Sequence, residues 1–469
     1  MRWMMGGEAG GGRDGQMSLL PDEGVDWSMA RPPRRVWLDD VRGDHGARLE
    51  FLAAQGLRLI MFSPGPVEGG TLHFHNPRDG ETLHLRAEGG RCLLPVAAAS
   101  FPAASRRMRE LRGMEEGMPR DLDAPILLNR EGCLVAVEAG RVTGLAEAWA
   151  ECPGVALRGS KAAQACEALE KVGGYEGVAR ALSFAQACEE ARGMKVPPAA
   201  MALRALLLES VRAQSHLSWL GEAVAFLGKR RISAACRESR HALEEAVSSW
   251  LGDPLGRGWV VPGGVKESFP IEDAEETLVS LSEVSRRWEE LSGRIAGARA
   301  PRWMEKRLAG LRELAREAAF TGPLARALGM EVDTRAEESG AYALLGWEMV
   351  VRGEGRLFAD LLSVKAREVK ESLSLIRRVL ESPLNRPLEA RRGRGGRNEG
   401  FGRCEGPEGE VCCHLALEKG AITYLAFSHP AELNKAGVHV LRGCRLDEAE
   451  PLFLLWKSLA PPPASIPGG

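Results

Sequence analysis

Residues 171–189 have the sequence KVGGYEGVARALSFAQACE. A glycine-rich turn leads into a helical run, and Tyr175 stands at the start of that helix. Glu176 and Arg180 are four residues apart, which makes them neighbours on a helix. On a helix surface such a pair contributes only a few tenths of a kcal/mol. If both residues are buried, we expect their charges to neutralise each other, because an unpaired buried charge is costly.

Length and composition indicate a globular protein of more than one domain. The chain has 469 residues, more than the roughly 250 to 300 at which a single core stops growing. Hydrophobic residues make up 44% and charged residues 27% of the chain, an ordinary globular balance. The formal net charge of -2 provides no electrostatic basis for binding nucleic acid or an anionic membrane surface.

Apolar runs are too short to cross a membrane, which takes roughly 18 residues. The longest candidate, residues 93–104, is interrupted by Pro95 and Pro102. We therefore expect no membrane span and a cytoplasmic location. Residues 1–16 are rich in glycine and have no apolar signal-peptide core. We expect residues 1–33 to be disordered or flexible, with Met17 as an alternative initiator.

Ten cysteines are scattered along the chain, and no two of them have the C-x-x-C spacing of zinc, iron-sulfur or redox sites. Cys412 and Cys413 lie near Cys404 and His414, but adjacent cysteines do not easily point at one metal. We expect buried, reduced thiols, since free cysteine behaves as a small hydrophobic residue.

Residues 34–125 are predicted to form a small α+β domain. Half-buried antiparallel strands are expected at 36–38, 57–62, 71–75 and 82–85, and helices at 47–55 and 103–112. His73, His75 and His84 fall on neighbouring strands. The three could gather as metal ligands, or His73 and His75 could simply occupy solvent-facing strand positions.

Residues 126–469 are predicted to form a mainly helical bundle, so the fold class is α+β. Short strands are expected at 126–128 and 134–137, with further short β elements near the C-terminus. Helices are expected at 199–222, 225–250, 272–299, 303–319 and 342–382. The Arg/Gly-rich residues 391–403 are predicted to be a loop. An RGG-like RNA-binding arm is the alternative there, disfavoured because the segment is short and internal.

Several motifs occur in one order along the chain. They are Val196-Pro197-Pro198 with Arg204, Glu209, Arg212 and Ser215-His216-Leu217; Pro262-Gly263-Gly264-Val265; residues 321–329 with Asp333 and Arg335; the helix through Arg367, Glu368 and residues 371–376; and residues 405–410, EGPEGE. In this order they resemble the large subunits of nickel-iron hydrogenases and of respiratory complex I. Residues 101–119 resemble the signature of the small complex I subunit that is fused ahead of the large subunit in formate hydrogenlyase. There Ser105 and Arg107 replace two glutamates, and Met118 replaces a histidine.

The resemblance implies that the metal ligands are lost. The stretch 171–189 is similar to the hydrogenase motif Arg-x-Cys-Gly-x-Cys-x-x-x-His, with Gly173 and Glu176 at the two cysteines and Arg180 at the histidine. The last cysteine pair of the family falls on Pro462 and Ser465. Nickel and iron in such a site need soft thiolates. We therefore expect no metal and no other cofactor bound by this chain, with the possible exception of a quinone.

Complex I large subunits place a quinone head group in the vacated space, which makes a quinone site the second implication of the resemblance. Tyr175 is one residue from the family tyrosine position, and its phenol could donate to a quinone carbonyl. The alternative is a half-buried tyrosine at a helix start. His216 is either a packed helix residue or a cavity residue, and Glu408 replaces the family arginine near the iron. Residues 125–140 contain no histidine.

The resemblance implies a subunit of a membrane-associated electron-transfer complex, peripheral on the cytoplasmic face. An iron-sulfur cluster would be held by a neighbouring small subunit, and membrane subunits would complete the assembly. Whether the chain is itself an enzyme stays open. The alternative is a non-catalytic scaffold or assembly paralogue, because both cysteine pairs and the quinone histidine are absent together.

Overall fold

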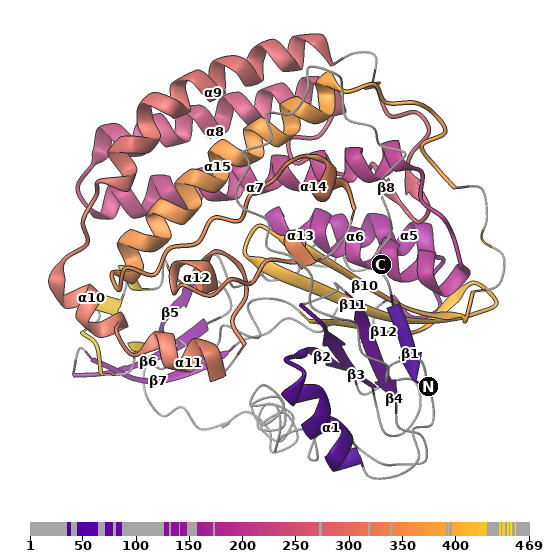
Figure 1. The fold of residues 1–469 in the computed structure, drawn as a ribbon. Helices are drawn as coiled ribbons and strands as arrows, with labels where there is room; N and C mark the ends of the chain where they lie inside the picture. Colours follow the sequence, from indigo (N-terminus) through magenta and orange to yellow (C-terminus); the bar gives the residue numbers. More distant parts are fainter. Residues whose placement is uncertain are drawn as a thin grey trace, which may run out of the picture.

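Four long helices form the upper body of the molecule in Figure 1. They are α7 (Pro198–Phe226), α8 (Arg230–Leu251), α9 (Glu275–Ala296) and α15 (Leu357–Glu381). α7 and α9 each pack against both α8 and α15. Pro198 stands in the first turn of α7, where its missing N–H costs no helical hydrogen bond. The predicted helical bundle is confirmed, as are the helices expected at 199–222, 225–250 and 272–299.

This computed structural model describes most of the chain beyond residue 156 and parts of what precedes it. The described residues are 35–38, 45–63, 71–77, 81–86, 126–130, 133–139, 141–147, 157–171, 174–271, 274–317, 319–337, 340–390, 393, 396–428 and short pieces between 440 and 455. Within them, every helix is too short or too polar to span a membrane. The predictions for residues 1–33 and for the 103–112 helix fall outside these residues.

Two predicted helices are wrong in extent. The helix expected at 303–319 is divided at Ala309 and Gly310 into α10 (Arg302–Leu308) and α11 (Leu311–Glu317). The helix expected at 342–382 consists of α14 (Ala341–Leu344), an irregular segment, and α15. Within that segment Gly346 and Gly353 have φ of +60° and +132°, which a right-handed helix does not allow.

An antiparallel sheet lies beneath the bundle and is covered by α6 (Gly177–Arg192). Its strands are β10 (Glu399–Gly406), β11 (Gly409–Glu418) and β12 (Ala421–Ser428). β10 overlaps the predicted 391–403 loop, so that prediction is wrong from residue 399 onward. A Cβ at Gly402 would lie 1.7 Å from the carbonyl oxygen of Ser183, and one at Gly400 would lie 2.0 Å from that of Ala187. Glycine is therefore required here because the α6 backbone touches the strand.

The N-terminal sheet packs on the β10–β12 sheet through Ile60, Met61, Phe401 and Cys412. Its order is β1 (Arg35–Leu38), β4 (Thr82–Arg86), β3 (Thr71–His75), β2 (Arg58–Ser63), and α1 (His45–Ala54) precedes β2. All four predicted strands and the first predicted helix are present. Two details differ from the prediction: β1 pairs with β4 in parallel, and β3 is buried at all five positions.

Smaller elements connect these layers. β5 (Ile126–Arg130) and β6 (Cys133–Glu138) confirm the strands expected at 126–137, and β7 (Arg141–Glu147) extends them into a three-stranded sheet. α5 (Ala162–Lys171) and the hairpin of β8 (Val260–Val261) and β9 (Gly264–Val265) adjoin α6 and α7. α12 (Gly322–Ala327) packs against α15, and α13 (Thr334–Glu337) packs against β10.

Candidate functional site

Glu176 joins the 171–189 stretch to the EGPEGE turn between β10 and β11. It ends the short helix η3 (Gly174–Glu176), is buried, and accepts a hydrogen bond of 3.0 Å from the backbone N–H of Glu408. A Cβ on Gly406 would lie 2.3 Å from Oε2 of Glu176. The two segments that the sequence predicted to share a site are therefore in contact. Gly173, Pro462 and Ser465 lie outside the described residues.

Glu408 forms a buried ion pair with Lys365 of α15. The Nζ of Lys365 lies 2.9 and 2.8 Å from the two carboxylate oxygens, and the hydroxyl of Ser215 donates to Oε1 at 3.1 Å. Burial raises the pKa of Glu408 to about 7, with Lys365 opposing this effect and the neighbouring Glu176 adding to it. Glu408 is thus a carboxyl group that can gain or lose a proton near neutral pH.

His216 of α7 connects Lys365 to Glu368, and both of these residues lie on α15. Its Nδ1 lies 3.4 Å from the Nζ of Lys365, and its Nε2 lies 2.8 Å from Oε2 of Glu368. Burial and the adjacent Lys365 lower the pKa of His216 to about 3, so the imidazole is neutral. A neutral ring that accepts from an ammonium at Nδ1 donates its Nε2 proton to Glu368. His216 is a fully buried, hydrogen-bonded helix residue that bridges two ion pairs.

Ion pairs extend the network to β10 and α13. Arg326 lies 2.7 Å from Glu368, 2.8 Å from Asp333 and 2.8 Å from Glu405. Arg335 pairs with Asp333 at 2.8 Å. All of these side chains are buried. Such charges are tolerated because each one faces an opposite charge at hydrogen-bonding distance.

Lys365 is the member of the network that the sequence analysis missed. The other charged members occur in the recognised motifs, but Lys365 does not. Its only signal is its place on the apolar side of α15, one turn from the buried Leu361 and Val369. A lysine in such a stripe usually extends its head group to solvent. Here Glu408 meets it from a distant segment.

Tyr175 and Arg180 are the other two candidates in the 171–189 stretch. Arg180 is buried, as Glu176 is, and this excludes the surface pair that was one of the two alternatives. Tyr175 is half-buried, and its hydroxyl lies 3.4 Å from Nη1 of Arg240 on α8, which also binds Glu244. Its polar end therefore contacts α8.

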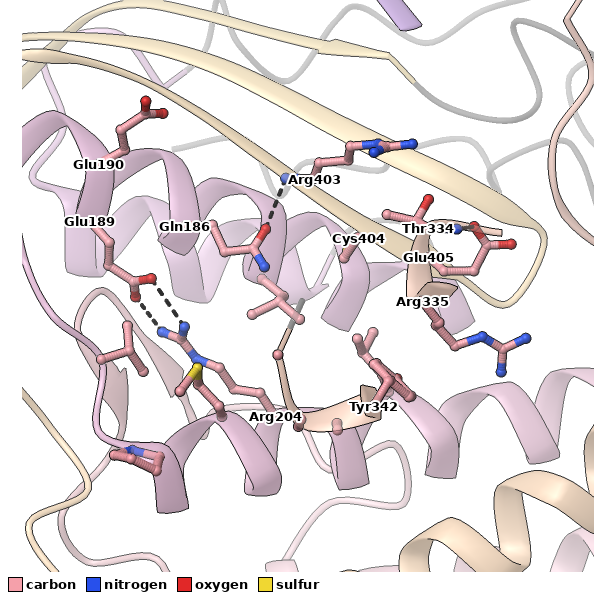
Figure 2. Close-up of a pocket in the computed structure, with 18 of the residues that line it drawn as sticks. Gln186, Glu189, Glu190, Arg204, Thr334, Arg335, Tyr342, Arg403, Cys404 and Glu405 are labelled. Atoms are coloured by element: carbon pink, nitrogen blue, oxygen red, sulfur yellow. Dashed lines mark hydrogen bonds and ion pairs between the residues drawn. The ribbon is translucent and has the colours of Figure 1, made fainter. Parts of the chain in front are cut away.

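A cavity of about 640 Å³ lies between α6, the first half of α7, β10, α13 and α14. Figure 2 shows the Arg204–Glu189 ion pair at one end and Arg335, Tyr342 and Glu405 at the other. Leu182, Met201 and Leu208 supply apolar walls. The cavity shares Arg335 and Glu405 with the buried network, whereas the candidate quinone-site residues do not line it: Tyr175, Glu176, Arg180, His216 and Glu408.

Tyr342 also links the cavity to the central helices. Its hydroxyl donates to Glu209 at 2.8 Å, and Glu209 accepts further bonds from Ser372 and Arg212 at 2.6 and 3.1 Å. Arg212 donates to the carbonyl oxygens of Glu405 and Gly406, both at 2.7 Å. Nearby cations outweigh the effect of burial and lower the pKa of Glu209, which therefore stays ionised.

The histidines expected on neighbouring strands are all buried, which excludes the solvent-facing alternative for His73 and His75. His73 and His84 are in direct contact, Nδ1 to Nδ1, at 2.7 Å, while His75 lies 3.3 Å from Glu337. Over the described part of the chain, no three histidine, cysteine or acidic side chains are grouped so as to hold a metal ion. Seven cysteines are buried free thiols, as expected: Cys166, Cys188, Cys236, Cys404, Cys412, Cys413 and Cys444.

Residues 227–395 match the family model described as the 49 kDa subunit of respiratory-chain NADH dehydrogenase. NADH-quinone oxidoreductase subunit 4 of Thermus thermophilus is 30% identical over 207 residues, 43% of this chain and 49% of that protein. Formate hydrogenlyase subunit 5 of Escherichia coli is 30% identical over 224 residues, 47% of this chain and 39% of that protein. The chain thus spans about half or less of these curated relatives.

The fold of this chain is also similar to that of a solved structure. It is that of the membrane-bound sulfane sulfur reductase, an archaeal respiratory membrane complex. One of its chains superimposes with a TM-score of 0.58 over 70% of this chain and 91% of that chain. At 19% identity, this match concerns the fold alone.

Proposed function

We propose that this chain belongs to the family of complex I and hydrogenase large subunits and is a subunit of a membrane-associated complex of the complex I or formate hydrogenlyase type. In this proposal it occupies the hydrogenase or quinone-site position, peripheral on the cytoplasmic face of the membrane. An iron-sulfur small subunit packs beside it, and membrane subunits anchor the assembly.

The observation that carries the proposal is the buried Lys365–Glu408 ion pair beside Glu176. The family resemblance brings the 171–189 stretch and the EGPEGE turn together around a metal or a quinone. In this chain the two segments meet through a hydrogen bond from the Glu408 backbone to Glu176, and Lys365 supplies the positive charge. Hydrogen bonds and an ion pair between protein groups thus take the place that the resemblance would give to a metal or a quinone.

Neither a nickel-iron centre nor a quinone suits these residues. Nickel and iron at such a centre need thiolates, whereas Glu176 supplies a hard oxygen and glycine and proline supply no side-chain ligand. A quinone would need a phenol directed at it, whereas the Tyr175 hydroxyl contacts Arg240. Of the two roles inferred from the sequence, these contacts favour the non-catalytic scaffold within the complex.

Metal content tests this role directly. We would purify the complex through a tag on this chain and measure its nickel, iron and acid-labile sulfide. We expect iron and sulfide from the partner small subunit and no stoichiometric nickel. Nickel at one equivalent per chain, or a chain that purifies with no iron-sulfur partner, would contradict the proposal.

A second function, quinone binding in the 640 Å³ cavity, is favoured by its size and mixed lining. Small-molecule sites are typically apolar hollows of about 300 to 1,000 Å³ with a few polar groups. Ala205→Phe would narrow this cavity, while Tyr175→Phe changes only the α8 contact. If the chain is a scaffold, both variants leave quinone reduction by the assembled complex unchanged. A rate loss in Ala205→Phe alone would establish the second function.

A further inference from the structure

A line of polar side chains lies buried between the N-terminal sheet and the β10–β12 sheet. Ser63, His73, His84 and His414 have no exposed surface, and Glu399 at the end of the line is 7% exposed. Aromatic rings cover the histidines: the His84 and Trp37 ring centroids are 4.2 Å apart, and those of His73 and Phe401 are 4.4 Å apart. Within this line each imidazole has other protein groups as its nearest proton donors and acceptors.

The contacts form one unbranched chain. Nδ1 of His84 lies 2.7 Å from Nδ1 of His73, and Nε2 of His73 lies 2.9 Å from Oγ of Ser63. Ser63 Oγ lies 2.5 Å from Nδ1 of His414, and Nε2 of His414 lies 2.7 Å from Oε1 of Glu399. Every link is within hydrogen-bonding distance.

Glu399 sets the direction of every hydrogen bond in this line. As a carboxylate paired with Arg86 it only accepts, so Nε2 of His414 donates to it. A neutral imidazole has one donor and one acceptor, so Nδ1 of His414 accepts from the Ser63 hydroxyl. That hydroxyl then accepts from Nε2 of His73, whose Nδ1 accepts from Nδ1–H of His84.

One acceptor is left over at the far end. Nε2 of His84 is buried and has no hydrogen-bond partner among the residues that the structure describes. Arg35 of β1, Arg86 of β4 and Arg397 ahead of β10 face the line, against Glu190 of α6 and Glu399. Burial, with these cations, lowers the pKa of His84, and burial likewise lowers those of His73 and His414. Burial and the nearby arginines thus favour the neutral form of each ring over the imidazolium form. A ring that gains a proton at one nitrogen therefore releases the proton from the other.

We propose that His84, His73, Ser63, His414 and Glu399 form a buried proton relay between the Nε2 of His84 and the carboxylate of Glu399. A proton from hydronium binds Nε2 of His84, and the Nδ1 proton of His84 moves to His73. The Nε2 proton of His73 moves to Ser63, the Ser63 proton moves to His414, and the Nε2 proton of His414 moves to Glu399. One proton enters and one carboxyl group is protonated, while every ring stays neutral with its tautomer reversed.

The tautomers of the three histidines test this relay. We would label histidine with ¹⁵N in the full-length chain and read each ring by two-bond ¹H–¹⁵N correlation. At pH 7.5 we expect Nδ1–H on His84 and Nε2–H on His73 and His414. In Glu399→Gln the amide oxygen faces Arg86 and the amide nitrogen donates to His414, so all three tautomers reverse together. Nδ1–H retained on His84 in this variant would overturn the relay.

Ser63 separates a relay from a merely structural contact. Adding Ser63→Ala to Glu399→Gln should confine the reversal to His414, whereas Ser63→Thr should restore it at His73 and His84. Ser233→Ala removes another buried hydroxyl, which binds Arg237, and should leave the reversal intact. If Glu399→Gln does not fold, acidifying the unaltered chain protonates the same carboxyl group. Formation of imidazolium on His73 or His84, in place of a reversed neutral tautomer, would then refute the proposal.

Discussion

Lys365 shows how a charged residue is accommodated in the interior. Its side chain lies on the packed face of α15, and the carboxylate of Glu408 holds its ammonium group 2.8 Å away. Ser215 and His216, one helix away on α7, complete the surroundings. The charge is retained because each polar atom finds a partner, and removing one partner leaves the other buried without its opposite charge.

Removing the Lys365 side chain should therefore cost much more than removing a surface lysine. We expect Lys365→Ala to lower the free energy of unfolding by about 3 to 5 kcal/mol, because Glu408 is left unpaired. Lys370→Ala is the matched control on the same helix: its side chain is 63% exposed, and we expect a change within about 0.5 kcal/mol. Urea unfolding followed by circular dichroism measures both values.

The double variant Lys365→Met, Glu408→Leu separates pairing from packing. With both charges gone, no ion is left unpaired, and we expect most of the stability lost in Lys365→Ala to return. Equal losses in the single and double variants would show that shape, not charge, holds this part of the structure together.

At the scale of elements, contact between α6 and β10 decides how the sheet meets the helices. Gly400 and Gly402 alternate along β10 on the side that touches the α6 backbone, while Phe401 and Arg403 point the other way, toward the N-terminal sheet. Glycine is unfavourable in a strand by propensity, and this explains why the sequence predicted a loop. Its presence reflects a close approach of two backbones, which only the tertiary structure shows.

Gly402→Ala should push β10 away from α6. A Cβ there would lie 1.7 Å from the carbonyl oxygen of Ser183, so the strand or the helix must move. We expect a loss of about 3 kcal/mol in unfolding free energy, because overpacking shifts backbone atoms. Thermal unfolding measures the loss as a lower Tm.

The control for this substitution is Gly293→Ala in α9, where no atom lies within 4 Å of the added Cβ. Alanine has a higher helix propensity than glycine, and we expect this variant to be more stable by up to about 1 kcal/mol. A Gly402→Ala protein as stable as the unaltered chain would show that α6 and β10 can separate without cost.

At the scale of the whole molecule, buried histidines make stability depend on pH. Burial is the main cause that lowers the pKa of five of them, to about 3 for His216 and His414, to about 2 for His75, and well below its usual range for His73 and His84. An unfolded histidine takes up a proton near pH 6.5. Below that pH the unfolded chain binds more protons than the native one, so stability falls as pH falls.

Carboxyl groups whose pKa is raised by burial oppose this trend. Burial raises the pKa of Glu170 and of Glu408 to about 7, so the native chain binds their protons first and gains stability as pH falls below 7. Burial also raises the pKa of four further groups, Glu305, Asp360, Glu371 and Glu405. Each histidine that stays neutral when folded costs about 2 kcal/mol at pH 5, and we expect the five histidines to outweigh these carboxyl groups. We expect a net loss of stability between pH 7.5 and pH 5 in urea unfolding.

A single substitution isolates the histidine contribution. His414→Gln should reduce the loss between pH 7.5 and pH 5 by about 2 kcal/mol, because one buried neutral ring is removed. The exposed His241, whose side chain is 69% accessible, serves as the control, and His241→Gln should leave the pH dependence unchanged. An equal pH dependence in His414→Gln and the unaltered chain would mean that His414 is protonated in the native state.

Local sequence patterns predicted the fold class, a resemblance to complex I and hydrogenase large subunits, and the order of most helices and strands. These depend on local periodicity, on turn residues and on motifs such as PPAAMALR at 197–204, all of which are properties of neighbouring residues. The sequence also predicted that the 171–189 stretch and the EGPEGE turn belong to one site, and Glu176 and Glu408 do meet there.

Only the tertiary structure decided which charges face one another. The partners that determine the chemistry of a buried charge or histidine are distant along the chain. Ser63 and His414, for example, are 351 residues apart, and Lys365 and Arg326 likewise meet carboxylates from other segments. Spacing along the chain carries no information about such contacts. Burial then sets the proton affinity of each group, because the cost of a charge depends on how much water and how many opposite charges surround it.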